Sequence, residues 1–323
     1  MNQPAASASR EKPPSFGLRV EEVTRSFGSV KALDQVSFDV PTKSIFGLVG
    51  PNGAGKTTLF SIIAGFLKPD GGKIEILDGL PPESPDLLGR VSILPQDALF
   101  DRNLSILDQL VFYRRLQGAS RRVARDEVAA ALTRVGLGSY LERGVSVLSH
   151  GMAKRLGIAQ AFLGSPELIF LDEPTAGLDP RNAKRIREVI ADLSEHSTVV
   201  VSSHNLFELE DLCDDVGILD RGQVKAVGTP EAMMSARRRI ELEFATAPTE
   251  EDLEAYRSVS AVSAAEHVAD RRFHLNLDDS SDPAEAIAAV LELTLKRGLT
   301  PKSFREGPSL EEIFLELTEE SPS

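Results

Sequence analysis

One short segment of the sequence has residue types and a spacing suited to binding phosphate. Residues 50–57 read Gly-Pro-Asn-Gly-Ala-Gly-Lys-Thr, which fits the phosphate-loop pattern of a glycine, four variable residues and then Gly-Lys-Ser/Thr. In such loops, backbone N–H groups close around phosphate oxygens, and the following helix adds the positive end of its dipole. We expect Lys56 to reach the β- and γ-phosphates and the Thr57 hydroxyl to ligate Mg²⁺. The predicted nucleotide-binding residues here are Gly50, Pro51, Asn52, Gly53, Ala54, Gly55, Lys56, Thr57 and Thr58.

Two carboxylates farther along the chain can supply the second half of such a site. The apolar run Leu168–Leu171 predicts a buried strand that ends at Asp172 and Glu173. We expect Asp172 to reach the Mg²⁺ shell and Glu173 to orient the attacking water. Because acidic residues often end strands without a function, this pair gains weight only from lying downstream of the phosphate loop.

The elements that must position these residues alternate between strands and helices. Over about 18–232, short apolar strands, helical patterns and glycine-rich turns follow one another, which indicates α/β layering. Strands are predicted at 45–49, just before the phosphate loop, and at 198–201, just before Ser202, Ser203 and His204. A helix is predicted at 56–64.

Between these elements, residues from about 97 to 150 form a mostly helical insert. Val128, Leu132 and Val135 recur there at the spacing of one helix face. We therefore expect a flexible tail over 1–16 and a nucleotide-binding domain over 17–236 that contains the helical insert.

The pattern after Arg239 is that of a small α+β domain, which we place at 237–323. Alternating apolar residues predict half-buried strands at 240–244 and 273–277. The domain shows no phosphate loop or metal cluster of its own in the sequence. The residues suited to cap or start its helices are Asp282, Pro283, Ser309 and Glu312.

Charge and composition restrict the possible functions. The chain has 323 residues, of which 41% are hydrophobic and 26% charged, which excludes wholesale disorder and a collagen-like chain. The net charge is −13, and residues 241–323, with 7 basic and 19 acidic side chains, carry −12 of it. A nucleic-acid partner is not expected, because binding one requires clustered lysines and arginines.

The sequence also bears on membranes and redox state. No run without a charged residue exceeds the 12 residues of Ser44–Gly55, whereas a membrane-spanning helix needs about 20 predominantly apolar residues. We expect the chain not to cross a membrane by itself. The single cysteine, Cys213, excludes an intrachain disulfide and fits a reducing compartment. The first residues lack the apolar core of a secretion signal.

Further motifs follow the phosphate loop in a characteristic order. They are Gln96 in Ile-Leu-Pro-Gln-Asp, Leu148–Met152 (Leu-Ser-His-Gly-Met), Ala176–Asp179 (Ala-Gly-Leu-Asp) and His204, with Phe27 ahead of the loop. Together with the phosphate loop and Asp172, this order resembles the ATP-binding subunits of ABC (ATP-binding cassette) transporters. The resemblance implies a P-loop ABC ATPase cassette of the α/β class, with a mixed sheet and a helical subdomain, followed by the small α+β domain.

The resemblance also implies ATP and Mg²⁺ as cofactors and a role for each motif. In the family, two cassettes close head to tail over two ATP molecules. Ser149 and Gly151 of one copy would then contact the γ-phosphate held by Lys56 of the other. Glu173 would act as general base, and His204 would hold the γ-phosphate.

The remaining motif residues have implied roles as well. Gln96 would ligate Mg²⁺ or sense the attacking water, Phe27 would stack on adenine, and Asp179 would belong to the nucleotide-binding set. The implied partners are a second ATP-binding subunit, in a homodimer, and integral membrane permease subunits at the cytoplasmic face of the membrane.

One motif departs from the family pattern. The usual signature is Leu-Ser-Gly-Gly-Gln, whereas His150 and Met152 occupy its third and fifth places here. This version resembles subunits that serve export-type, ABC-2-like permeases, and the segment 308–318 resembles the tail of the same group. An exporter is therefore expected.

Several alternatives stay open at this point. The phosphate loop could be a turn without ligand, His204 a satisfied histidine at a strand end, and Phe27 part of the core. The arginines between 114 and 125 could form a solvated face or contact anionic lipid, and the C-terminal domain could serve stability alone. The alternative function is a soluble ABC ATPase that acts as a switch without transport.

Overall fold

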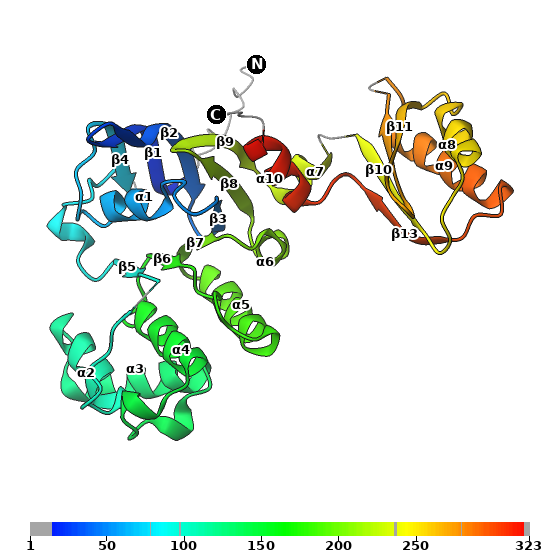
Figure 1. Ribbon diagram of the computed structural model, residues 1–323. Helices are drawn as coiled ribbons and strands as arrows, with labels where there is room; N and C mark the ends of the chain where they lie inside the picture. The colour runs from blue at the N-terminus through cyan, green and yellow to red at the C-terminus, as the bar shows by residue number, and fades with distance from the viewer. Residues whose placement is uncertain (1–14, 78, 97, 236–237, 279, 320–323) are drawn as a thin grey trace, which may run out of the picture. The chain divides into compact units, whose positions relative to one another are not determined.

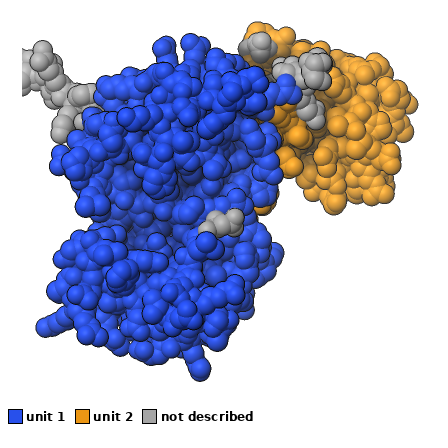
Figure 2. Space-filling model, turned by 60° about the vertical axis from the view of Figure 1, so that its left-hand side comes forward, with its two compact units in different colours: residues 1–204, 212–227 blue, residues 205–211, 228–323 orange. Residues whose placement is uncertain are grey.

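The computed structural model describes residues 15–77, 79–96, 98–235, 238–278 and 280–319 (Figure 1). They form two compact units. The first runs to residue 204 and also contains 212–227, and the second contains 205–211 and the chain from 228 onward (Figure 2). The predicted boundary at 236–237 and residues 1–14 of the predicted tail lie outside the described residues. Among the described helices, none has the length and apolar character needed to cross a bilayer.

A six-stranded sheet forms the centre of the first unit (Figure 1). Its order is β5 (Val91–Leu94), β6 (Leu168–Asp172), β7 (Thr198–Ser203), β3 (Ile45–Val49), β8 (Asp215–Asp220) and β9 (Gln223–Gly228). Every residue of β3, β6 and β7 is buried, as expected for parallel strands that are covered on both faces. The pairs from β5 to β8 are parallel, so the carboxyl ends of these strands meet at one edge. The three predicted strands before and after the site are confirmed.

A three-stranded antiparallel sheet and helix α1 complete the surroundings of the phosphate loop. The elements are β2 (Val30–Pro41), β1 (Phe16–Phe27), β4 (Gly71–Ile76) and α1 (Lys56–Ile63). Phe38 of β2 stacks on Phe46 of β3, with 5.0 Å between the ring centroids. Phe60 of α1 meets Phe170 of β6 edge-on at 5.6 Å. The first contact joins the two sheets, and the second holds α1 against the central sheet.

Among its described residues, the predicted helical insert, about 97–150, contains two α-helices, and a third begins at its last residue. Figure 1 shows these helices gathered at one end of the first unit. These helices are α2 (Ile106–Leu116), α3 (Arg121–Arg134) and α4 (His150–Ala161), and α5 (Pro180–Ser194) follows β6. The first unit also contains 3₁₀ turns at Pro85–Leu87, Gly138–Tyr140 and Val145–Val147. Val128, Leu132 and Val135 are fully buried, which confirms the helical spacing. A serine N-cap begins each of the first three helices, where its side chain accepts a first-turn N–H.

The second unit contains a four-stranded antiparallel sheet in the order β11-β12-β10-β13. Its elements are α6 (Leu206–Glu210), α7 (Pro230–Ser235), β10 (Arg239–Phe244), α8 (Glu250–Arg257), β11 (Val262–Ala269), β12 (Arg272–Leu277), α9 (Pro283–Lys296), β13 (Pro301–Glu306) and α10 (Leu310–Glu319). Helices α8 and α9 cover the apolar face, where Phe244, Tyr256 and Phe273 pack together.

The caps predicted for this unit are confirmed. Asp282 accepts hydrogen bonds from first-turn N–H groups of α9. The Ser309 hydroxyl accepts the Glu312 N–H, and the Glu312 carboxylate accepts the Ser309 N–H, which makes a complete capping box. Strands β10 and β12 are also where the sequence predicts them, although the buried polar residues Glu241 and His274 interrupt the expected alternation on their second face.

Replacing Phe170 tests how far the central core supports the site. Phe170 is fully buried between the sheet and α1, so Phe170→Ala should lower the free energy of unfolding of the first unit by about 3–5 kcal/mol. Phe66→Ala is the control, since that ring is 82% exposed, and it should change stability by no more than about 0.5 kcal/mol. Urea titration followed by circular dichroism measures both. Equal effects of the two substitutions would contradict the packing described here.

Candidate functional site

The loop between β3 and α1 has the conformation of a phosphate cradle. Gly53 and Gly55 have φ angles of +84° and +111°, which favour glycine. A Cβ atom at Gly55 would also lie 2.5 Å from the Ala32 carbonyl oxygen. Because Gly55 is the N-cap of α1 and offers no side-chain acceptor, the first N–H groups of the helix are available to an anion.

Lys56 is a buried cation held inside this loop. Its side chain is 7% exposed, and its Nζ donates hydrogen bonds to the carbonyl oxygens of Gly50, at 2.5 Å, and Pro51, at 3.2 Å. Burial lowers the pKa of Lys56, and the charges of Glu173 and Asp172 oppose that shift. The loop carbonyls are neutral acceptors, whereas a phosphate group would give the Lys56 ammonium a partner of opposite charge.

A cavity of about 400 Å³ joins the loop to the carboxylates. It is lined by Val30, Lys31, Ala32, Asn52, Gly53, Ala54, Gly55, Lys56, Thr57, Thr58, Gln96, Asp172, Glu173 and Arg221. The structure therefore brings together most of the predicted phosphate-loop residues with three predicted residues from distant segments. Sequence reasoning missed the wall formed by residues 30–32 and Arg221, which carries no motif.

At the carboxyl ends of β6 and β7, Asp172, Glu173, Ser202 and His204 are joined by hydrogen bonds. The sequence predicts a role for all of these residues except Ser202. Asp172 lies opposite Ser202 in the parallel register. The Ser202 hydroxyl donates to Asp172 Oδ1 and accepts the Glu173 N–H, at 3.0 Å. Glu173 is 6% exposed and has φ +51°, and its Oε2 lies 2.5 Å from Nδ1 of His204. The buried Ser202 thus positions both carboxylate residues.

Helix α4 connects the signature segment to this edge. Ser149 is its N-cap and accepts the Met152 N–H, and Gly151 lies in its first turn, where a Cβ would be 3.3 Å from the Leu178 side chain. Lys154, one turn farther, donates from Nζ to the carbonyl oxygens of Gln96, at 3.2 Å, and Glu173, at 3.1 Å. No motif pointed to Lys154, although it ties three motifs together.

Seven predicted residues lie outside the described lining of the cavity: Phe27, Gly50, Pro51, Ser149, Gly151, Asp179 and His204. Phe27 is 47% exposed, and the guanidinium of Arg25 lies 4.9 Å from its ring centroid. Asp179 is the N-cap of α5, where the N–H groups of Asn182 and Arg181 bind its carboxylate and lower its pKa. Within the described chain, Asp179 therefore has a local structural role.

Comparisons with known proteins agree with this geometry. Residues 33–176 match the model of the ABC transporter family. The chain is 32% identical over 314 residues to the daunorubicin/doxorubicin resistance ATP-binding protein of Streptomyces peucetius, covering 94% of this chain and 93% of that protein. The chain belongs to the ATP-binding proteins of ABC transporters. As an ABC ATP-binding protein it is an ATPase whose activity is coupled to transport.

Other similarities differ in how much of this ABC protein they cover. The linearmycin resistance ATP-binding protein of Bacillus subtilis is 32% identical and matches 93% of this chain and 98% of its own length. The solved structure of cbiO1 from Clostridium perfringens, part of an ABC transporter complex, is 28% identical with a TM-score of 0.62, but covers 68% of this chain and 90% of its own. The resistance proteins therefore match more of this chain than that cassette structure does.

Ser202→Ala tests the hydrogen-bonded edge of this ABC cassette. The change leaves Asp172 and the Glu173 N–H each without one partner, and should destabilise the first unit by about 1–3 kcal/mol. ATP turnover should also fall by about tenfold or more, because both carboxylates lose their positioning contact.

Ser197→Ala is the matched control for that change. Ser197 is also buried and donates to the Pro166 carbonyl, but it precedes β7, at the opposite end from the catalytic edge. It should cost similar stability and leave turnover unchanged. If both variants lose turnover equally, Ser202 has no special positioning role.

Proposed function

We propose that this chain is the ATP-hydrolysing subunit of an exporter. It works as a head-to-tail homodimer and uses Mg²⁺. It drives separate permease subunits from the cytoplasmic face of the membrane. One observation supports the catalytic part of the proposal most directly. A single cavity joins the phosphate loop, Gln96, Asp172 and Glu173, and His204 is hydrogen-bonded to Glu173.

The residues around the cavity suit a Mg²⁺–ATP complex. The cradle of Gly53 and Gly55 is open to an anion, Lys56 supplies a buried positive charge, and the buried Asp172 supplies a carboxylate. We assign Thr57, Gln96 and Asp172 as the residues that would hold Mg²⁺, because hydroxyl, amide and carboxylate oxygens are the ligands it prefers. Bound there, Mg²⁺ would neutralise charge on the phosphate oxygens.

Glu173 is our candidate for the general base. Its carboxylate faces the cavity, its backbone N–H is held by Ser202, and its carbonyl is held by Lys154. The contact between Glu173 Oε2 and His204 Nδ1 orients the carboxylate, so it can accept a proton from water that attacks the γ-phosphate. Gln96 lines the same cavity, where it can position that water.

The proposed dimer would complete the site. Ser149 and Gly151 do not line the described cavity of their own chain. Helix α4 is 12 residues long and begins at this segment. Its N-terminus would offer N–H groups to an anion held by a second copy. A head-to-tail pair would contain two such composite sites. Phe27 would stack on the adenine, since its ring is half-exposed.

Export is the direction that the relatives favour. Two proteins similar over nearly the whole chain are named for resistance to daunorubicin/doxorubicin and to linearmycin, and a third, the bacitracin transport ATP-binding protein of Bacillus licheniformis, is 36% identical over 70% of this chain. Resistance conferred by a transport ATPase is most simply explained by removal of the compound. The switch without transport is the less favoured alternative.

Glu173→Gln tests the assignment of the base. The carboxamide keeps the size of the side chain but does not accept the proton of water, so hydrolysis should fall by at least about 100-fold. ATP binding should remain, and the variant should accumulate as an ATP-bound dimer, measured by size-exclusion chromatography with light scattering. Unchanged turnover would remove Glu173 from this role.

Changes in the signature segment test the composite site. Ser149→Arg places a bulky side chain where the second copy would close, and should abolish turnover at saturating ATP. Met152→Gln restores an amide without a large change of volume, and should maintain or raise turnover. If Ser149→Arg lowered turnover by no more than about twofold, the result would contradict the shared site. Removing a transition-state contact usually has a far larger effect.

A further inference from the structure

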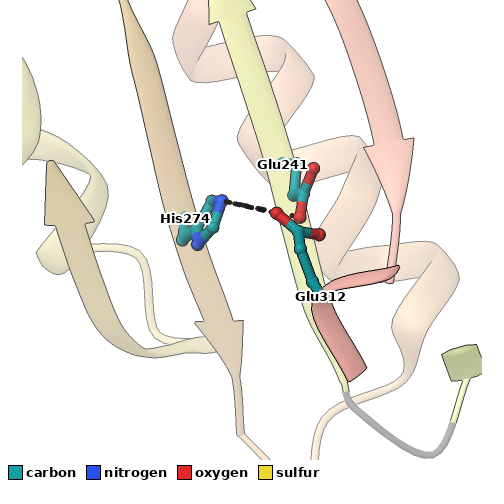
Figure 3. A group of neighbouring side chains, drawn as sticks. All are labelled: Glu241, His274 and Glu312. Carbon is teal, nitrogen blue, oxygen red and sulfur yellow. Dashed lines mark ion pairs between the residues drawn. The ribbon is translucent and has the colours of Figure 1, made fainter. Parts of the chain in front are cut away.

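The polar face of the sheet in the second unit brings three metal-binding side chains together (Figure 3). Glu241 of β10 and His274 of β12 are partners in the antiparallel register. Glu312 joins them from the first turn of α10. Figure 3 shows the three side chains converging from these separate elements.

The distances among the three side chains are close to those of a metal shell. His274 Nε2 lies 3.5 Å from Glu241 Oε1 and 3.9 Å from Glu312 Oε1. Each residue offers one ligand atom, and these atoms all lie within 4.8 Å of one another. Zinc bonds of about 2.0–2.1 Å in a tetrahedron place neighbouring ligand atoms about 3.3 Å apart. Side-chain shifts of less than about 1 Å would therefore suffice.

The imidazole supplies a second, independent observation. His274 is 8% exposed, and its buried Nε2 has no hydrogen-bond partner among the described residues. Buried polar atoms nearly always have a partner, because leaving one unpaired is costly. An imidazole nitrogen without a hydrogen-bond partner can bind a cation through its lone pair.

Two arginines complete the cluster and influence what it can bind. Arg239 contacts Glu241 Oε1 and Glu312 Oε2, and Arg305 contacts Glu241 Oε2 and Glu312 Oε2. Their charges balance the two carboxylates, so the cluster does not attract cations by charge alone. Arg239 also lies 3.5 Å from Glu316, which offers it another carboxylate when a cation takes Glu241 Oε1.

We propose that Glu241, His274 and Glu312 form a binding site for a zinc-type divalent cation, with an open fourth position for water. An imidazole with two carboxylates suits a borderline-soft transition ion. Ca²⁺ requires six to eight oxygen ligands, and Mg²⁺ requires a nearly ideal octahedron. Both ions prefer oxygen ligands, whereas zinc binds an imidazole nitrogen well. The nearby arginines further select for a cation that forms strong ligand bonds.

Occupancy of this site would join α10 to the sheet. Glu312 belongs to α10, whereas Glu241 and His274 belong to β10 and β12. Helix α10 also contacts α6 and α7 within the same unit. The cation would therefore cross-link the helical and sheet parts of the second unit, and should raise its resistance to unfolding.

Zinc titration of the full-length chain tests the proposal. The protein is stripped with a chelator, and Zn²⁺ uptake is measured by competition with a chromophoric chelator. The wild type should bind one equivalent of Zn²⁺. Both His274→Gln and Glu312→Gln should lower the affinity for this ion by at least about 100-fold, which exceeds the usual effect of losing a residue that only supports a metal ligand. Glu312→Gln keeps an acceptor oxygen for the capping box, so it decides the question if His274→Gln fails to fold.

Two matched controls separate this site from general cation binding. His267 lies exposed on β11 of the same sheet, and Glu243 lies on the same face of β10, paired with Lys302. His267→Gln and Glu243→Gln should leave the bound equivalent unchanged, as should Glu173→Gln in the nucleotide site. Wild-type uptake in Glu312→Gln, or no uptake by the wild type, would overturn the proposal.

Discussion

The parallel pairing of β6, β7 and β3 is the constraint on which the site depends. These strands are buried throughout, so their polar residues gather where the strands end. The phosphate loop follows β3, Asp172 ends β6 with Glu173 directly after it, and His204 follows β7, so one edge collects all four features. A shift of one strand by a single position would separate Asp172 from Ser202 and break the hydrogen bonds to both carboxylate residues.

The sequence predicts the parts of the site whose chemistry depends on local spacing. The phosphate loop, the strand that ends at Asp172 and the helix caps can each be read from a few neighbouring residues. Ser202 and Lys154 could not be assigned in this way, because their roles arise from strand register and from the approach of α4 to the edge. A serine or lysine in those positions has no distinguishing local pattern.

The same reasoning explains the cluster in the second unit. The alternating apolar residues of β10 and β12 predict the strands, but they also predict that Glu241 and His274 face water. Both are buried, because α10 returns from the far end of the sequence and places Glu312 over that face. The sequence alone therefore does not reveal this group of side chains, since the three residues meet only after the chain has folded.

The short helix α6 shows that the two units are not consecutive segments of the chain. It begins two residues after His204, yet it belongs to the second unit, where it contacts α10. Recombination between related cassettes that exchanged only the residues from 228 onward would pair α6 with a foreign α10. A functional hybrid would have to carry residues 205–211 along with the C-terminal segment, so these two stretches should be inherited, or engineered, together.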